Sequence, residues 1–308
     1  MNPVDTPSTP LIAITGATGA VGSRVARRLA GTARLRLFSR DAARAEAAAR
    51  DLPGTTAAST VESAALDYAE GEGAASALAG ADVVLMVSAA ETDHRLADHA
   101  TFIRAAAAAG VGHLVYTSFL AAAPDAVFTL ARDHHATEEL LAASGVSHTI
   151  LRDNFYQDVF PLFAGEEGVL RGPAGDGRVS AVARDDVAAV AAVVLAEAAM
   201  ALAAGRSPEH SGTTYDLTGP EAFSLEEAAA VIGGVTGRPV RYLNETLAEA
   251  RASRAGYGAP DWQLEAWIST YTAIGSGDLA AVSGDVQRLL GRPAQTLRQT
   301  LERSQRQV

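Results

Sequence analysis

Apolar residues recur along the first half of the chain in two alternating patterns. Short apolar runs that end in small or polar residues predict buried strands, and apolar residues spaced three or four apart predict helices. The predicted strands are Leu11–Thr15, Leu35–Phe38, Ser63–Leu66, Val83–Val87, His113–Thr117 and Val146–Leu151. The predicted helices are Val21–Leu29, Asp41–Arg50, Ala74–Ala79, Arg95–Ala109 and Leu130–Ser144. Because strands and helices alternate, the pattern predicts β-α-β units and a parallel sheet.

The regular alternation of strands and helices ends after residue 151. Asn154–Phe163 is aromatic and irregular, and Asp176-Gly177 has the composition of a turn between extended stretches. The predicted strands here are Tyr215–Leu217 and Val240–Leu243, and the predicted helices are Leu225–Val235, Glu245–Ala255 and Asp278–Leu290. The second half therefore predicts a smaller lobe of mixed α and β structure.

A glycine-rich turn links the first predicted strand to the first predicted helix. Gly16 permits a tight turn, Gly19 lets a phosphate approach the backbone, and Gly22 lets the helix lie close to the sheet. The free N–H groups and positive dipole end of the helix favour an anion. An ordinary β-α turn is the alternative, but the strand–turn–helix context favours dinucleotide binding. The predicted contacts are Gly16, Ala17, Thr18, Gly19, Ala20 and Val21.

The end of the second strand selects between the two nicotinamide cofactors. NAD sites place an acidic residue there for the ribose hydroxyl, and NADP sites place arginine near the 2′-phosphate. Ser39 and Arg40 stand at this point, so we predict NADP(H) as the preferred cofactor. Asp41 could instead turn inward and accept a ribose hydroxyl, which keeps NAD(H) as an alternative.

Two further strand ends are small or hydroxylic. In a doubly wound sheet the ligand lies across the carboxyl ends of the strands. Ser88, Ala89 and Ala90 end the fourth strand and leave room for a ribose, while Thr117 and Ser118 end the fifth. Each of these residues is unremarkable alone, but their shared location makes them predicted cofactor contacts.

These features define the expected architecture. We predict an α/β protein with a Rossmann-type, doubly wound parallel sheet and a smaller mixed α/β substrate lobe. Residues 1–10 form a flexible tail, residues 11–151 the NAD(P)-binding domain, and residues 152–308 the smaller lobe. Part of the second half is expected to cross back and complete the sheet.

Composition narrows the classes of function. The chain has 308 residues, 48% of them apolar, and a formal net charge of −11, so we expect no nucleic-acid or membrane partner. It contains neither cysteine nor lysine, which excludes disulfides, thiolate chemistry and lysine Schiff bases. The apolar run Val187–Ala204 contains Glu197 and predicts a buried helix of a soluble protein. The N-terminus lacks a signal-peptide pattern, so we expect a cytoplasmic protein.

Several segments resemble a known family. They are Ile12–Gly19, Val115–Ser118, Asp133-His134 with Thr137-Glu138, Ser144–Val146, Thr149–Arg152 with Asn154 and Tyr156, Gly172–Arg178, and Asp186–Ala188. On these residues the chain resembles the atypical short-chain dehydrogenases/reductases of the NmrA-like branch, and within it the type 2 NAD(P)H:quinone oxidoreductases. The likeness spans most of the chain and weakens after about residue 245. The glycine motif is shared widely, whereas the segments at His134 and at Asn154–Tyr156 are more specific.

The resemblance implies a two-lobed enzyme with the substrate over the nicotinamide, between the lobes. It makes His134 and Tyr156 the candidate catalytic residues, and adds His134, Asn154 and Phe155 to the cofactor contacts. Tyr-x-x-x-Lys, the usual pair of short-chain dehydrogenases, is impossible without lysine. A quinone needs less help, because it accepts hydride readily and its oxyanion is delocalised. His134 could donate the one hydrogen bond required, or serve only in packing.

The resulting prediction is an NADPH-dependent reductase of a quinone or similar conjugated carbonyl compound. One alternative is an NmrA-like redox sensor that binds NADP(H) without turnover, and another is a tailoring reductase or isomerase of a biosynthetic pathway. His134 and His135 lie near Glu138 and Glu139, but the sequence shows no HExxH motif, so we expect no metal site. A homodimer is left open, because exposed helices in such folds often pair.

Overall fold

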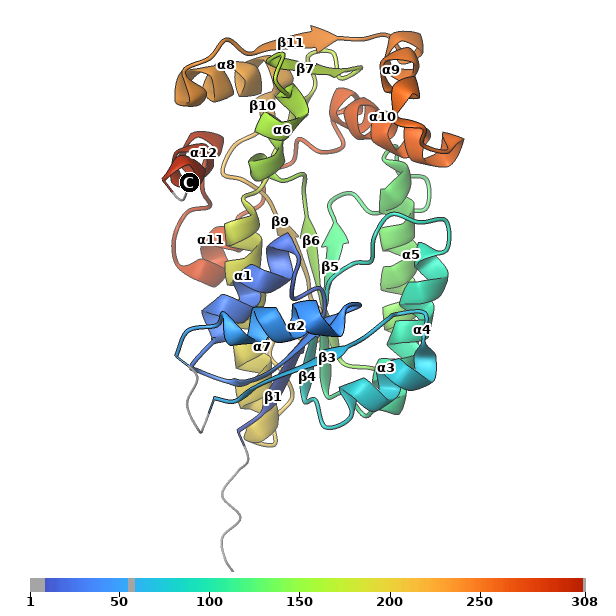
Figure 1. Ribbon diagram of the computed structural model, residues 1–308, viewed down its shortest axis with the longest axis vertical. Coiled ribbons are helices and arrows are strands. Elements are labelled where there is room, and N and C mark those ends of the chain that lie inside the picture. The colour runs from blue at the N-terminus through green and yellow to red at the C-terminus, as the bar shows by residue number, and fades with distance from the viewer. Residues whose placement is uncertain (1–8, 55–58, 307–308) are drawn as a thin grey trace, which may run out of the picture. The chain divides into compact units, whose positions relative to one another are not determined.

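A seven-stranded sheet forms the centre of the fold (Figure 1). The computed structural model describes residues 9–54 and 59–306, so the tail predicted over residues 1–10 lies outside the described residues except for Thr9 and Pro10. The strands are β1 Leu11–Ile14, β2 Arg34–Ser39, β3 Val61–Ala65, β4 Val83–Met86, β5 His113–Phe119, β6 His148–Asp153 and β9 Thr214–Leu217. Their order is β3-β2-β1-β4-β5-β6-β9, with parallel pairing from β3 through β5. The predicted doubly wound, Rossmann-type sheet is confirmed.

Helices cover both faces of this sheet. They are α1 Ala20–Leu29, α2 Ala42–Arg50, α3 Gly71–Leu78, α4 Arg95–Ala108, α5 Thr129–Ala143 and α7 Arg184–Ala203. In Figure 1, α1 and α7 lie on one side of the sheet, and α3, α4 and α5 lie on the other. The strands β1 and β4 are buried along their whole length, as strands covered on both faces should be.

Helix α7 contains the apolar run that we predicted as a buried helix. Among the described residues it is the one helix long and apolar enough to cross a membrane, by length and composition alone. Most of its apolar stretch is buried inside the protein. Burial against protein accounts for the apolar composition, as in the core helix of a globular fold.

The chain forms two compact units that each draw on several segments. Unit 1 contains the described residues up to Thr117, together with Thr137–Leu151 and Ala188–Thr214. Unit 2 contains Ser118–Ala136, Arg152–Val187 and the described residues from Tyr215 onward. Strand β9, which follows α7, thus adds a strand from the second half of the chain to the sheet.

Unit 2 combines helices with short strands. They are η1 Gln157–Val159, α6 Phe160–Ala164, β7 Val169–Gly172, β8 Arg178–Val179, β10 Phe223–Ser224, α8 Leu225–Thr236, β11 Arg241–Asn244, α9 Leu247–Arg254, η2 Ala255–Tyr257, α10 Asp261–Ser276, α11 Asp285–Leu290 and α12 Leu297–Gln305. Strand β7 pairs with β11 in parallel, and β8 pairs with β10 antiparallel. Apolar side chains from α6, β7, α8, α10 and α12 share one core.

The C-terminal helices differ from the prediction. The helix expected over Asp278–Leu290 covers only Asp285–Leu290, and helices α10 and α12 were not predicted. Residues 279–281 are not helical because their backbone carbonyls accept hydrogen bonds from elsewhere: the hydroxyl of Ser180 lies 2.6 Å from the Ala281 oxygen, and its N–H lies 2.9 Å from the Leu279 oxygen. Tertiary hydrogen bonds have replaced the local helical ones.

Candidate functional site

The glycine-rich turn is a cradle that side chains would fill. Gly16 has φ of 58°, in the left-handed region, and a Cβ there would lie 3.3 Å from the Cβ of Val87. A Cβ on Gly22 would lie 2.3 Å from the Gly16 carbonyl oxygen. Gly19 caps α1 without a side chain, so the N–H groups of the first helical turn stay open to a ligand. This arrangement fits the pyrophosphate of a dinucleotide.

Beside the cradle, the end of β2 presents a cation. Arg40 is exposed, and Ser39 is half-buried. The neighbouring carboxylate of Asp41 is engaged in capping α2, because it accepts hydrogen bonds from the backbone N–H groups of Ala43 at 2.9 Å and Arg44 at 3.2 Å. Asp41 is therefore held by the helix, and Arg40 is the charge presented at the strand end.

The segment after β4, Val87–Ala90, is fixed by side chains from distant parts of unit 1. The Val87 N–H donates to the Thr15 hydroxyl at 2.9 Å, and the Val87 carbonyl accepts from the Tyr68 hydroxyl at 2.7 Å. The Ser88 N–H donates to the Thr117 hydroxyl at 3.0 Å. These bonds set the shape of the segment at the carboxyl end of β4, where a doubly wound sheet binds its ligand.

Three residues that hold this segment were missed by sequence reasoning. Tyr68 is one. Arg95 donates from Nη2 to the Ser88 hydroxyl at 2.6 Å, and His99 accepts from the Ala89 N–H at 2.9 Å. Arg95 and His99 lie four residues apart, so they share one face of α4. No signal for this pair was available in the sequence, because the burial of Arg95 and His99 is evident only in the fold.

In unit 2, His134 lies on α5 and is 7% exposed. Its ring centroid is 6.1 Å from that of Phe119, which ends β5. Phe119 also packs against Phe155 with a centroid distance of 5.0 Å. The adjacent His135 is half-buried. Within residues 9–54 and 59–306, no group of three or more histidine, aspartate or glutamate side chains could hold a metal ion.

The segment Asn154–Tyr156 directs its polar groups into unit 2. The Asn154 amide nitrogen donates to the Ser180 hydroxyl at 3.0 Å and to the Leu279 carbonyl at 3.1 Å. The Tyr156 hydroxyl donates to the Asp153 carboxylate at 2.5 Å, and the Arg184 guanidinium lies 4.8 Å from its ring centroid. Burial, and then the negative charge of Asp153, raise the pKa of Tyr156 well above its ordinary value.

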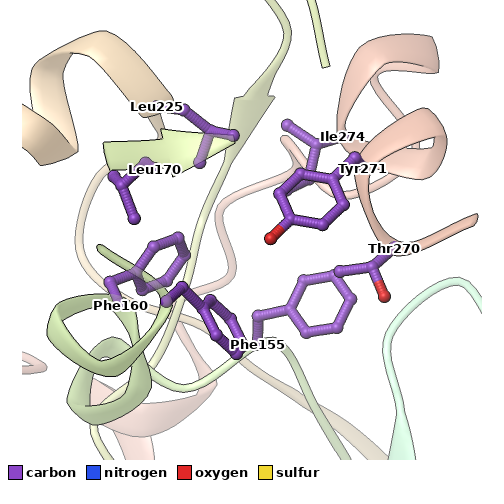
Figure 2. Close-up of a pocket in the computed structure, with 8 residues that line it drawn as sticks. Phe155, Phe160, Leu170, Leu225, Thr270, Tyr271 and Ile274 are labelled. Atoms are coloured by element: carbon purple, nitrogen blue, oxygen red, sulfur yellow. The ribbon is translucent and has the colours of Figure 1, made fainter. Parts of the chain in front are cut away.

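A small pocket in unit 2 begins beside Phe155. Figure 2 shows side chains from α6, β7, α8 and α10 turned toward the same space. The lining is almost wholly apolar, with hydroxyls from Thr270 and Tyr271. Its residues are Phe155, Phe160, Phe163, Leu170, Leu225, Thr270, Tyr271 and Ile274. The space is about the size of one water molecule, so its relevance lies in the apolar character of the surface beside Phe155.

The predicted site residues therefore fall into two groups. Unit 1 holds Gly16, Ala17, Thr18, Gly19, Ala20, Val21, Ser39, Arg40, Ser88, Ala89, Ala90 and Thr117. Unit 2 holds Ser118, His134, Asn154, Phe155 and Tyr156. Within unit 1, the cradle and the segment after β4 meet directly, since the Cβ of Val87 lies against Gly16.

Several known proteins are similar to this chain over nearly its whole length. A family model described as NAD(P)H-binding matches residues 16–198. Quinone oxidoreductase 2 of Escherichia coli is 34% identical, over 94% of this chain and 97% of its own. An NAD(P)H azoreductase of Xenophilus azovorans is 33% identical, over 93% of this chain and 95% of its own. The crystal structure of the NADPH-dependent quinone oxidoreductase of Escherichia coli, complexed with NADPH, superposes with a TM-score of 0.81 at 33% identity, over 95% of this chain and 99% of that one.

Proposed function

Because the chain belongs to the NAD(P)H-binding family, we propose that it is an NADPH-dependent oxidoreductase that transfers hydride to a quinone or a similar conjugated carbonyl compound. The observation that carries the proposal is the open cradle at Gly16–Gly22 with Arg40 beside it. Two relatives at least 33% identical over nearly the whole chain, a quinone oxidoreductase and an azoreductase, support the reductive chemistry. A cytoplasmic location and a homodimer stay predictions.

The residues of unit 1 fit the cofactor. The cradle would receive the pyrophosphate on the backbone N–H groups of the loop and of the first turn of α1. Arg40 would pair with the 2′-phosphate, because the neighbouring Asp41 carboxylate is occupied as a helix cap. The ordered segment Val87–Ala90 would support the ribose on the nicotinamide side. When bound, the reduced nicotinamide supplies a hydride.

The acceptor side needs few protein groups. A quinone that gains a hydride and, from solvent, a proton becomes a hydroquinone, and the negative charge that develops is delocalised over the ring. We assign to His134 the hydrogen bond to the carbonyl oxygen where that charge develops. The apolar side chains beside Phe155 would exclude water and orient a flat acceptor.

In this proposal Tyr156 is a positioning residue and not a catalytic one. Its hydroxyl proton is committed to the Asp153 carboxylate, and its raised pKa keeps the phenol protonated at neutral pH. The phenol would therefore fix the backbone next to Phe155 and leave the hydrogen bond to the acceptor carbonyl to His134. Catalysis by Tyr156 itself would require this short hydrogen bond to break.

The test follows NADPH consumption with menadione and with a simple benzoquinone. We expect turnover with both. His134→Ala should lower kcat/KM by roughly 100-fold, the usual contribution of a positioned acid. His135→Ala is the matched control, since it removes the neighbouring imidazole on the same helix and should leave kcat/KM nearly unchanged. Tyr156→Phe should cost less than His134→Ala.

Three outcomes would contradict the proposal or part of it. Tight NADPH binding with no turnover on any quinone would indicate a redox sensor or a reductase of another substrate. Turnover of an azo dye without turnover of a quinone would place the acceptor specificity with the azoreductase relative. Equal losses in His134→Ala and His135→Ala would remove the assigned role of His134.

A further inference from the structure

The segment after β4 carries an unusual partner for a backbone amide. Its first two N–H groups, of Val87 and Ser88, donate to hydroxyls, whereas the N–H of Ala89 donates to Nε2 of His99 at 2.9 Å. His99 lies on α4 and is 0% exposed. A histidine in contact with cofactor-binding backbone, yet closed to solvent, has no part in the chemistry described above.

We propose that His99 is a positioning residue for NADPH, which sets the shape of the Val87–Ala90 segment and ties it to helix α5 through Thr137. The inference rests on the proposed cofactor site. It concerns residues of unit 1 alone.

The hydrogen bonds of His99 define the protonation state and the tautomer of its imidazole ring. A backbone N–H can only donate, so Nε2 of His99 must accept and carries no proton. The neutral imidazole then has its proton on Nδ1, which lies 2.9 Å from the Thr137 hydroxyl and donates to it. A protonated ring would have two donors and would break the bond to Ala89. The contact therefore requires one tautomer.

The surroundings hold that tautomer in place. The rings of Tyr68 and Tyr116 lie 6.1 and 5.8 Å from the imidazole centroid and pack edge-on against it. Burial, and then the positive charge of Arg95, lower the pKa of His99 to about 3. The imidazole is thus neutral at neutral pH, and Nε2 is available to accept from Ala89.

The bond to Thr137 connects the segment to a second functional element. Thr137 follows His134 by one turn on α5, so one imidazole links the predicted ribose support to the helix that carries the predicted hydrogen-bond donor. Loss of the bond to Ala89 would leave the half-buried Ala89 N–H without its protein partner and allow the segment to shift. A shift there should weaken cofactor binding, whereas a purely structural histidine would leave it unchanged.

The experiment measures binding without turnover. The dissociation constant of NADPH is determined by fluorescence titration for wild type, His99→Leu and His99→Gln. We expect His99→Leu to raise Kd by roughly tenfold, as the loss of one hydrogen bond predicts. His99→Gln should recover most of the affinity, because its amide oxygen can accept from Ala89. Steady-state assays should show the loss mainly in the KM for NADPH.

His113→Leu is the matched control. His113 is also 0% exposed and in unit 1, and both of its ring nitrogens are also hydrogen-bonded, in this case to the hydroxyls of Ser147 and Thr149. These partners lie outside the Val87–Ala90 segment. The His113→Leu variant should lower Tm as His99→Leu does and leave the Kd of NADPH unchanged. Equal Kd values for wild type and a folded His99→Leu would overturn the inference.

A further measurement, on the wild-type protein, tests the inference even if the His99 variants fail to fold. In the wild-type protein without nucleotide, the Ala89 amide should exchange its hydrogen as slowly as the amides of β4 do. Rapid exchange at Ala89 would contradict the inference. Absence of NADPH binding by the wild type would contradict the proposed function instead, so the two failures are distinguishable.

Discussion

Arg40 and Asp41 are adjacent in the chain, but within the described residues only the side chain of Asp41 is engaged by the protein's own backbone. Asp41 accepts from two backbone N–H groups of α2 and stabilises the helix start. Its carboxylate could otherwise have bound a ribose hydroxyl, as an acidic residue does in NAD sites. Arg40 is left as the exposed charge at the strand end, and a guanidinium there favours a 2′-phosphate.

This division of tasks predicts the cofactor preference of an Arg40→Ser variant. Removing the guanidinium should raise the KM for NADPH by roughly 10- to 100-fold, the value of a charge-assisted hydrogen bond, and leave the KM for NADH nearly unchanged. Steady-state kinetics with each cofactor give the ratio. Arg50→Ser, at the far end of α2, is the control. Equal changes for both cofactors would remove Arg40 from phosphate recognition.

Among the secondary-structure elements, the packing of α1 onto the start of the sheet depends on the absence of a side chain. Gly22 lies in the first turn of α1, and its backbone approaches the carbonyl of Gly16. The obstructing atoms belong to the backbone, which cannot rotate away as a side chain can. The cradle and the packing of α1 therefore have the same cause.

Gly22→Ala should damage both stability and cofactor binding. The added methyl would meet the Gly16 carbonyl at 2.3 Å, so α1 must move away from β1. We expect a loss of about 1–3 kcal/mol in the free energy of unfolding, as in overpacked cores, together with weaker NADPH binding. Thermal unfolding and nucleotide titration measure the two effects.

Gly256→Ala is the control, because a Cβ at Gly256 meets no atom within 4 Å. That variant should keep the Tm and the NADPH affinity of the wild type. A Gly22→Ala variant with wild-type affinity would show that the cradle tolerates displacement of α1.

The stability of the whole molecule should depend on two histidines that are neutral in the fold. Burial is the main cause that lowers the pKa of His99 to about 3 and of His113 to about 4, from 6.5. Below pH 6.5 the unfolded chain binds protons at both positions and the folded chain does not. Stability is therefore complete above pH 6.5 and falls as the pH decreases toward 4.

Urea unfolding between pH 5 and pH 7.5 tests this dependence. Each such histidine contributes at most about 1.4 kcal/mol per pH unit to the slope of stability against pH. His113→Gln cannot titrate, so it should show a shallower slope than wild type between pH 5 and pH 6.5. Identical slopes would mean that His113 has the same pKa in the folded and unfolded chains.

The alternation of strands and helices could be predicted from the sequence, because each element is determined by residues close to one another in the chain. Buried strands such as Val83–Met86 are continuous apolar runs, and Asp41 begins its helix through bonds to residues two and three positions away. The glycine turn was recognisable for the same reason, since strand, turn and helix are contiguous. The doubly wound sheet and the cofactor cradle followed from these local features.

The roles of single polar residues depend on partners that no local pattern contains. His99 and Thr137 are 38 positions apart, and Asn154 and Leu279 are 125 apart. Folding brings them within hydrogen-bonding distance, and burial then makes each bond obligatory, because an unsatisfied buried polar group is costly. For this reason the residues that hold Val87–Ala90, the engagement of Tyr156 with Asp153, and the non-helical path of residues 279–281 became evident from the folded chain.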